Sequence, residues 1–196
     1  MVKLQDTKPV IFEVFVHWLY YQRFPNLDSG DDADLVREWG TSEKRDPLMM
    51  NLVKLYILGD QHVIPKLQED ALDSLHRHVQ GPCTTTPGDV EISLAFRWLR
   101  PSTPLCRYLI DVSIYYDCCE KDGTTPYEMD GTEKYPAEFL LGIARRATQV
   151  IGGIRWQEKN IRDFELDICD YHEHKDNEEK EACKKDRKGP GLANVP

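Results

Sequence analysis

Apolar residues recur at helical spacing along much of this chain. Two segments joined by a short turn show the pattern best, at Leu48, Leu52, Leu55, Tyr56 and Gly59 in the first and at Ile64, Leu67, Ala71, Leu75 and Val79 in the second. Positions three and four apart share one face of a helix. Pro65 suits the first turn of a helix, where its missing N–H costs nothing. The pattern between Leu52 and Val79 therefore predicts two amphipathic helices packed face to face.

A third helix is predicted from Val10 to Tyr21, and it is apolar on two faces. One face carries Phe12, Phe15, Val16 and Leu19, and the other carries Ile11, Val14, Trp18 and Tyr21. Because a helix that is apolar all round is normally a buried one, we expect Phe12, Phe15 and Trp18 to lie in the core.

The order of residues in these helices resembles the second half of a BTB/POZ domain of the fungal type. The resemblance covers about the first 80 positions: a strand-like Val2-Lys3-Leu4, a Pro-x-x-Phe helix start, a Trp-Leu-Tyr helix end, then Leu-x-Leu-Tyr-x-Leu and Ile-Pro-x-Leu. It implies a partial BTB/POZ domain over residues 1–80, interrupted by an acidic insert at 25–47. Two positions depart from the family. Tyr21-Gln22 stands where a small residue and glycine usually turn the chain, and Gly59 replaces an alanine.

The resemblance also implies how such a chain would work. A BTB/POZ domain begins with a strand hairpin and two helices, and this chain starts just before what resembles the third strand. Without that half, we expect part of an apolar surface to lie uncovered and to bind other proteins or a second copy of the chain; its residues are Ile11, Val14, Trp18, Leu52, Tyr56 and Leu67. The alternative is a closed monomer in which later helices around Leu109 and Leu140 cover the gap. In this family the expected roles are self-association and adaptor work in transcription or in cullin-type ubiquitin ligases.

The rest of the chain divides into a helical extension at 81–160 and a C-terminal segment at 161–196. A Pro/Gly/Thr-rich linker from Gly81 to Gly88 precedes the extension. Pro104 and Pro136 each stand before an apolar stripe, which predicts two further helix starts. We therefore expect a mainly α fold, with a short strand at the N-terminus as its one β element.

Composition and charge narrow the functional classes. The chain has 196 residues, of which 40% are hydrophobic and 30% charged, as is ordinary for a globular protein. Its net charge of −9 argues against direct nucleic-acid binding, which depends on Lys and Arg neutralising phosphates. No apolar run is long enough to span a membrane, and the N-terminus lacks the order of a signal peptide. We therefore expect an intracellular protein whose six cysteines stay reduced.

The sequence carries none of the common catalytic motifs, which predicts that the protein is not an enzyme. Nucleophile elbows, phosphate-binding glycine loops and His-Glu-x-x-His helices are all missing from it.

One group of residues has metal-ligand chemistry. Cys169, His172, His174 and Cys183 form C-x2-H-x-H-x8-C. The order of Phe164, Leu166 and Ile168 suggests an extended approach, in which both histidines would project to one side. Against a zinc site, the spacing matches no common zinc module. In addition, eleven of the fourteen residues from Lys175 to Lys188 are charged. That run is either an exposed helix or disordered. We therefore favour ordinary surface residues and no cofactor, with a structural zinc protein as the alternative function.

Overall fold

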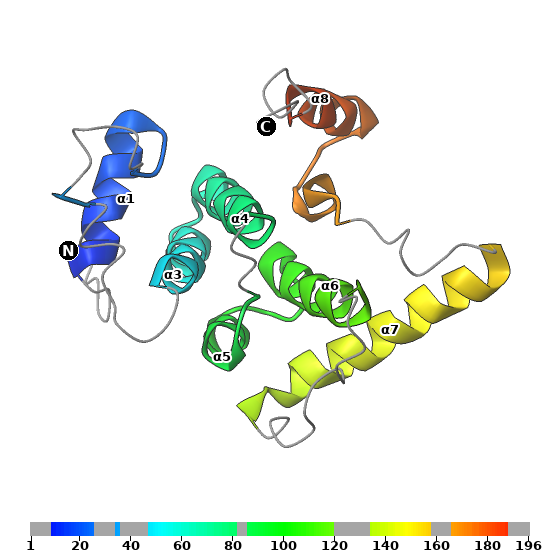
Figure 1. Cartoon of the computed structure of the whole chain (residues 1–196). Coiled ribbons are helices and arrows are strands. Elements are labelled where there is room, and N and C mark those ends of the chain that lie inside the picture. Colours follow the sequence, from blue (N-terminus) through cyan, green and yellow to red (C-terminus); the bar gives the residue numbers. More distant parts are fainter. Residues whose placement is uncertain are drawn as a thin grey trace, which may run out of the picture.

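The computed structural model describes residues 9–25, 34–35, 47–81, 86–119, 134–157 and 166–187. Within these ranges lie seven α-helices and one short 3₁₀ helix (Figure 1): α1 (Pro9–Tyr21), α3 (Pro47–Gln61), α4 (Pro65–Val79), α5 (Asp89–Trp98), α6 (Pro104–Cys119), α7 (Ala137–Gln157), η4 (Ile168–Tyr171) and α8 (Asn177–Arg187). No strand occurs in the described ranges, and the predicted mainly α class is confirmed. The strand expected at Val2 and Leu4 and most of the insert at 25–47 lie outside the described residues. None of the described helices is long and apolar enough to cross a lipid bilayer.

Helices α3 and α4 form the predicted pair. Pro65 begins α4 directly after the turn, and the backbone N–H of Ile64 donates to the carbonyl of Gly59 at 2.8 Å. The facing side chains are fully buried, among them Leu52, Leu55, Leu67, Ala71, Leu75 and Val79. Burial of each large aliphatic side chain contributes about 1.5–3 kcal/mol, so this interface is a major part of the core.

Gly59 lies where α3 comes closest to the start of α4. A Cβ atom at this position would stand 2.9 Å from Cγ of Gln68 and 3.3 Å from its backbone nitrogen. The approach is too tight for a methyl group unless the helices move apart. This explains why glycine stands here despite its cost of about 1 kcal/mol in a helix interior.

Helix α1 buries only one of its two apolar faces. Ile11, Val14 and Trp18 are at most 3% exposed, whereas Phe12 is 41% and Leu19 47% exposed. The prediction for Trp18 is confirmed and that for Phe12 is wrong. Helix α1 lies at the edge of the molecule and packs mainly on α3 (Figure 1), so one face has no helix against it among the described residues. Trp18 Nε1 also donates a hydrogen bond to the Asp70 carboxylate of α4, at 2.9 Å.

Gln22 ends α1 in the left-handed region, with φ of 52°. That conformation favours glycine, and it is disfavoured by roughly 1 kcal/mol or more for other residues. The Gln22 backbone N–H donates to the Trp18 carbonyl at 2.8 Å, and its side-chain amide donates to the Leu19 carbonyl at 3.1 Å. The chain therefore turns here with glutamine in a position that suits glycine, and these hydrogen bonds offset part of the cost.

The apolar surface expected to lie uncovered is buried in the structure. Each of its six members is at most 3% exposed: Ile11, Val14, Trp18, Leu52, Tyr56 and Leu67. That expectation is wrong because α1 and α5 pack on α3 and α6 extends the same core. The alternative was cover by later helices, and Leu109 is indeed fully buried in this core. Leu140 is not, since 37% of it is exposed.

Helices α5, α6 and α7 extend the core beyond the α3–α4 pair. Pro104 begins α6 as predicted, and Leu105, Tyr108, Leu109 and Val112 line its buried face. Helix α7 packs along α6 through Phe139, which is 1% exposed, and Ile143 lies partly buried beside it. One hydrophobic core therefore runs from α1 to η4.

Replacing Trp18 with alanine should lower the free energy of unfolding by roughly 3–5 kcal/mol, because a large buried side chain and its hydrogen bond to Asp70 are lost. Tyr20 is 81% exposed on the same helix, so Tyr20→Ala is the matched control and should change stability by no more than about 0.5 kcal/mol. Urea unfolding followed by circular dichroism measures both. Equal effects of the two substitutions would contradict the assigned face of α1.

Replacing Gly59 with alanine should lower the melting temperature, although alanine is the better helix former, because the added methyl group meets Gln68. Gln61→Ala, at the exposed end of α3, serves as the comparison. A rise in melting temperature for Gly59→Ala would show that the two helices tolerate the wider spacing.

Candidate metal centre

Four residues with metal-ligand side chains come together at the C-terminal end of the described chain. Cys169 lies in η4, His172 and His174 follow it, and Cys183 lies in α8. One ligand atom from each residue lies within 4.8 Å of all the others. Cys169 is 2% exposed, and the other three residues are partly buried. The group is therefore compact and largely shielded from solvent.

Two of the distances between its ligand atoms are close to those of tetrahedral coordination around a zinc-sized ion. The Sγ atoms of Cys169 and Cys183 are 3.5 Å apart, and His172 Nδ1 lies 3.4 Å from Cys183 Sγ. Zn–S bonds of about 2.3 Å and Zn–N bonds of about 2.0 Å at tetrahedral angles place two sulfurs about 3.8 Å apart, and a sulfur and a nitrogen about 3.5 Å apart. Small adjustments of these side chains would accommodate the ion.

His174 provides an independent observation. Its Nε2 atom is buried and has no hydrogen-bond partner among the described residues. A buried polar atom left in this way costs about 1–3 kcal/mol, so native proteins rarely contain one without a reason. The His172 and His174 rings lie edge to face with centroids 5.7 Å apart. A bound metal ion is one kind of partner that would satisfy a buried histidine nitrogen.

Local hydrogen bonds hold the Cys169 turn and α8 together. The Asp167 carboxylate accepts from the backbone N–H of Cys169 at 3.0 Å and pairs with the Lys184 ammonium of α8 at 3.0 Å. Burial acts to raise the pKa of Asp167, but Lys184 and the Cys169 N–H stabilise the carboxylate more, so this pKa lies below its usual value. The expected extended approach is wrong at Ile168, because residues 168–171 form a 3₁₀ helix that this carboxylate caps. Asp167 itself has an extended backbone, and Phe164 lies outside the described residues.

Charged residues also build α8 itself. The backbone N–H of Glu179 donates to the Asp176 carboxylate at 2.8 Å, and the Glu179 carboxylate accepts from the Lys175 N–H at 2.7 Å. Side chains thus satisfy backbone donors in the first turn of the helix, which would otherwise need water. Of the two alternatives for the charged run, the structure has the helix over Asn177–Arg187.

Buried hydrogen bonds attach this segment to the rest of the core. The Tyr171 hydroxyl donates to the Asp111 carboxylate of α6 at 2.7 Å, and Arg146 of α7 donates to the same carboxylate at 2.6 Å. Tyr171 also meets Tyr108 edge to face, with ring centroids 5.2 Å apart. Burial and the Asp111 charge raise the pKa of Tyr171 strongly, so its hydroxyl remains a donor at neutral pH.

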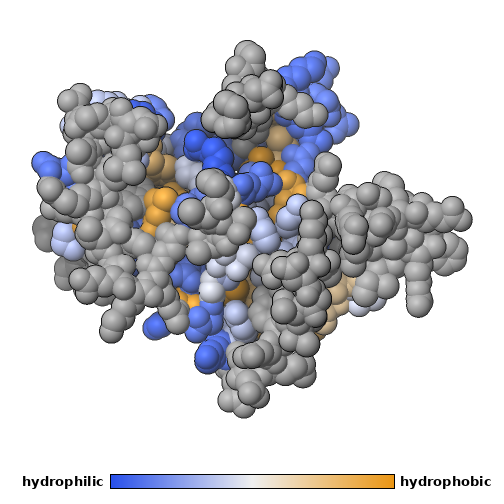
Figure 2. Space-filling model, viewed as in Figure 1, coloured by the Kyte–Doolittle hydropathy of each residue, from blue (hydrophilic) through white to orange (hydrophobic). Residues whose placement is uncertain are grey.

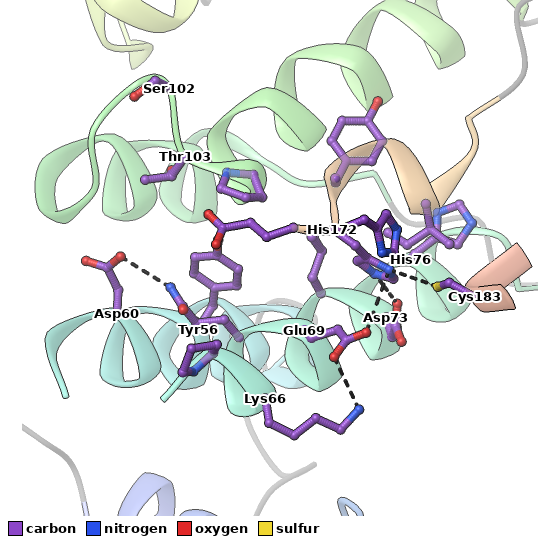
Figure 3. Close-up of a pocket in the computed structure, with 18 of the residues that line it drawn as sticks. Tyr56, Asp60, Lys66, Glu69, Asp73, His76, Ser102, Thr103, His172 and Cys183 are labelled. Carbon is purple, nitrogen blue, oxygen red and sulfur yellow. Dashed lines mark hydrogen bonds and ion pairs between the residues drawn. The ribbon is translucent and has the colours of Figure 1, made fainter. Parts of the chain in front are cut away.

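Three of the four candidate ligands, His172, His174 and Cys183, line a groove of about 1390 Å³ (Figure 3). Helix α4 supplies the opposite wall with Lys66, Glu69, Asp73 and His76, and the turn before α6 supplies Ser102 and Thr103. In Figure 3 the His172 ring points toward Asp73 on one side and toward Cys183 on the other. The arrangement places the candidate ligands, which lie within 14 positions of one another, beside a helix that is far from them in sequence.

Comparison with protein-family models, with curated proteins and with solved structures found no match. The resemblance to BTB/POZ domains therefore stays a prediction.

The four residues considered in the sequence lie together, as a metal site requires. Sequence analysis missed the contribution of Asp73, which approaches His172 across 99 positions of the chain. No local pattern could have indicated that contact.

Proposed function

We propose that Cys169, His172, His174 and Cys183 bind one Zn²⁺ ion as a structural centre that fixes the C-terminal segment to the helical core. The convergence of four ligand atoms within 4.8 Å carries this proposal. The orphaned Nε2 of His174 supports it independently.

The donor set favours zinc over harder cations. Thiolate and imidazole are preferred by zinc and other borderline or soft metals, whereas Mg²⁺ and Ca²⁺ prefer oxygen. Two thiolates balance the charge of a divalent ion, so a largely buried centre would be neutral. Four protein ligands fill a tetrahedral shell and leave no position for water, which is typical of structural and not of catalytic zinc.

Zinc binding would stabilise the folded chain, because the ligands converge only when η4 and α8 are in place. An ion that binds the native state at 100 times its dissociation constant adds about 2.7 kcal/mol to the free energy of unfolding. For a chain of this size each kcal/mol corresponds to about 2–4 °C in melting temperature.

The purified protein should contain about one equivalent of zinc by elemental analysis, and removal by a chelator should lower its melting temperature by several degrees. His174→Ala should lose the metal. His62→Ala is the matched control, since His62 is exposed on the turn after α3 and far along the chain from the cluster. Protein that carries no zinc after preparation with the metal present, and that melts unchanged with chelator, would overturn the proposal.

A second candidate function is protein binding by self-association through the exposed face of α1. This face carries Phe12 and Leu19, and Tyr20 and Tyr21 are 81% and 63% exposed beside it. On the side shown in Figure 2, the hydrophobic surface of the described residues is visible as small patches between hydrophilic and grey ones. Exposed aromatic and aliphatic residues on one helix face are typical of interfaces.

The charges at the two ends of α1 favour a second copy of this chain as the binding partner. Glu13 lies near the start of the helix and Arg23 just beyond its end, and both side chains are exposed. If two α1 helices paired antiparallel about a two-fold axis, Glu13 of each copy would face Arg23 of the other. The apolar residues between them would be buried at the same time. This agrees with the self-association that the BTB/POZ resemblance implies.

Light scattering over a range of concentrations should show a dimer that Leu19→Glu dissociates. Val63→Glu is the matched control, because Val63 is 82% exposed on the turn before α4 and lies away from this face. A wild-type protein that stays monomeric at every concentration would contradict self-association. A complex with a different protein, lost in Leu19→Glu alone, would instead identify α1 as a surface for another partner.

A further inference from the structure

We infer that Asp73 of α4 completes this metal centre as the carboxylate that orients His172, so that zinc binding joins the C-terminal segment to the central helix pair. The inference rests on the proposed zinc function and adds a residue outside the Cys/His motif.

The two nitrogens of the His172 ring have different neighbours. Nδ1 lies 3.4 Å from Cys183 Sγ, in the direction of the cluster, and Nε2 lies 2.9 Å from the Asp73 carboxylate. The His172 side chain is 2% exposed and that of Asp73 is 19% exposed, so water competes little for this contact. Nε2 therefore carries the proton and donates a hydrogen bond to Asp73, which leaves the lone pair of Nδ1 for the metal.

A hydrogen bond of this kind fixes the tautomer and the orientation of a metal-binding histidine. Zinc-bound histidines commonly donate their second N–H to a carboxylate, which also makes the ligating nitrogen more basic. Here the carboxylate comes from a residue 99 positions earlier in the chain. The C-terminal motif therefore lacks one part of its own site, and α4 supplies it.

Glu69 is the competing carboxylate, one helical turn before Asp73. Its nearest oxygen lies 3.8 Å from His172 Nδ1, which is beyond hydrogen-bond distance and on the metal side of the ring. Glu69 also pairs with Lys66 at 3.3 Å. It adds a negative charge near the cluster but does not set the tautomer. Comparing substitutions of Asp73 and Glu69 therefore distinguishes the effect of this hydrogen bond from the general effect of a nearby negative charge.

Zinc binding and the contact between His172 and Asp73 should stabilise each other, because the coupling between two such events is reciprocal. Zinc holds His172 in place for Asp73, and Asp73 holds His172 in place for zinc. An ion bound only by residues 169–183 would otherwise order a short segment alone. When Asp73 takes part, the binding energy of the ion also stabilises the position of that segment on α4.

The test compares zinc affinity of the full chain, by competition with a chromophoric chelator, in the wild type, Asp73→Leu, Asp73→Asn and Glu69→Gln. Asp73→Leu should weaken binding by roughly 10- to 100-fold, as loss of such an outer carboxylate typically does. Asp73→Asn keeps an acceptor without the charge and should lie between Asp73→Leu and wild type. Glu69→Gln removes the same charge and should change affinity much less. The Nε2–H tautomer of His172, seen by nitrogen NMR of the metal-free protein, should be lost in Asp73→Leu alone.

The possible outcomes separate the two proposals. Wild-type protein without zinc affinity would overturn the zinc function itself. Wild-type affinity retained in Asp73→Leu, or lost equally in Glu69→Gln, would overturn the role of Asp73 and leave the Cys/His centre intact. A lower melting temperature of metal-free Asp73→Leu with an unchanged zinc-induced rise would assign Asp73 to folding alone, which also overturns the inference.

Discussion

The packing of α4 against α3 determines where the other parts of the molecule attach. The apolar face of α4 lies in the core. Three of its polar residues, spaced three positions apart, each contact a different element. Asp70 binds Trp18 of α1, Asp73 binds His172 of the C-terminal segment, and His76 lies 3.1 Å from the Tyr108 hydroxyl of α6. Since residues three apart on a helix point about 60° away from one another, these contacts follow from one regular helix.

Hydrogen bonds to carboxylates hold the peripheral elements, and apolar packing holds the centre. Asp111 illustrates the division, because it is 7% exposed and accepts from both Tyr171 and Arg146. A buried carboxylate is costly unless such donors satisfy it, and removing one of them leaves that cost in place. The contacts that position η4 and α7 are therefore specific but sensitive to single substitutions.

Local patterns allowed much of the fold to be predicted, and distant contacts set the limit. Pro65 and Pro104 marked two helix starts because their effect acts within one turn. Phe12 was misplaced because apolar periodicity identifies two faces of α1 but does not say which one finds a neighbour. The ligand set of the candidate site could be proposed from residue types alone. Its geometry could not, because the alternation of Leu166 and Ile168 does not reveal the Asp167 cap that turns residues 168–171 into a 3₁₀ helix.

The contribution of Asp73 to the site also shows how a metal could act beyond its own ligands. Cys169 and Cys183 are 14 positions apart, so an ion joining them closes a short loop and removes little entropy from the unfolded chain. Long-range order has to come from contacts that cross the sequence, which here include His172 with Asp73 and Tyr171 with Asp111. These residues adjoin the ligands, so an ion that fixes the ligands also fixes the donors of both hydrogen bonds. Zinc would therefore act on the helical core through these two carboxylates, one on α4 and one on α6, together with the apolar packing of Ile168 and Tyr171.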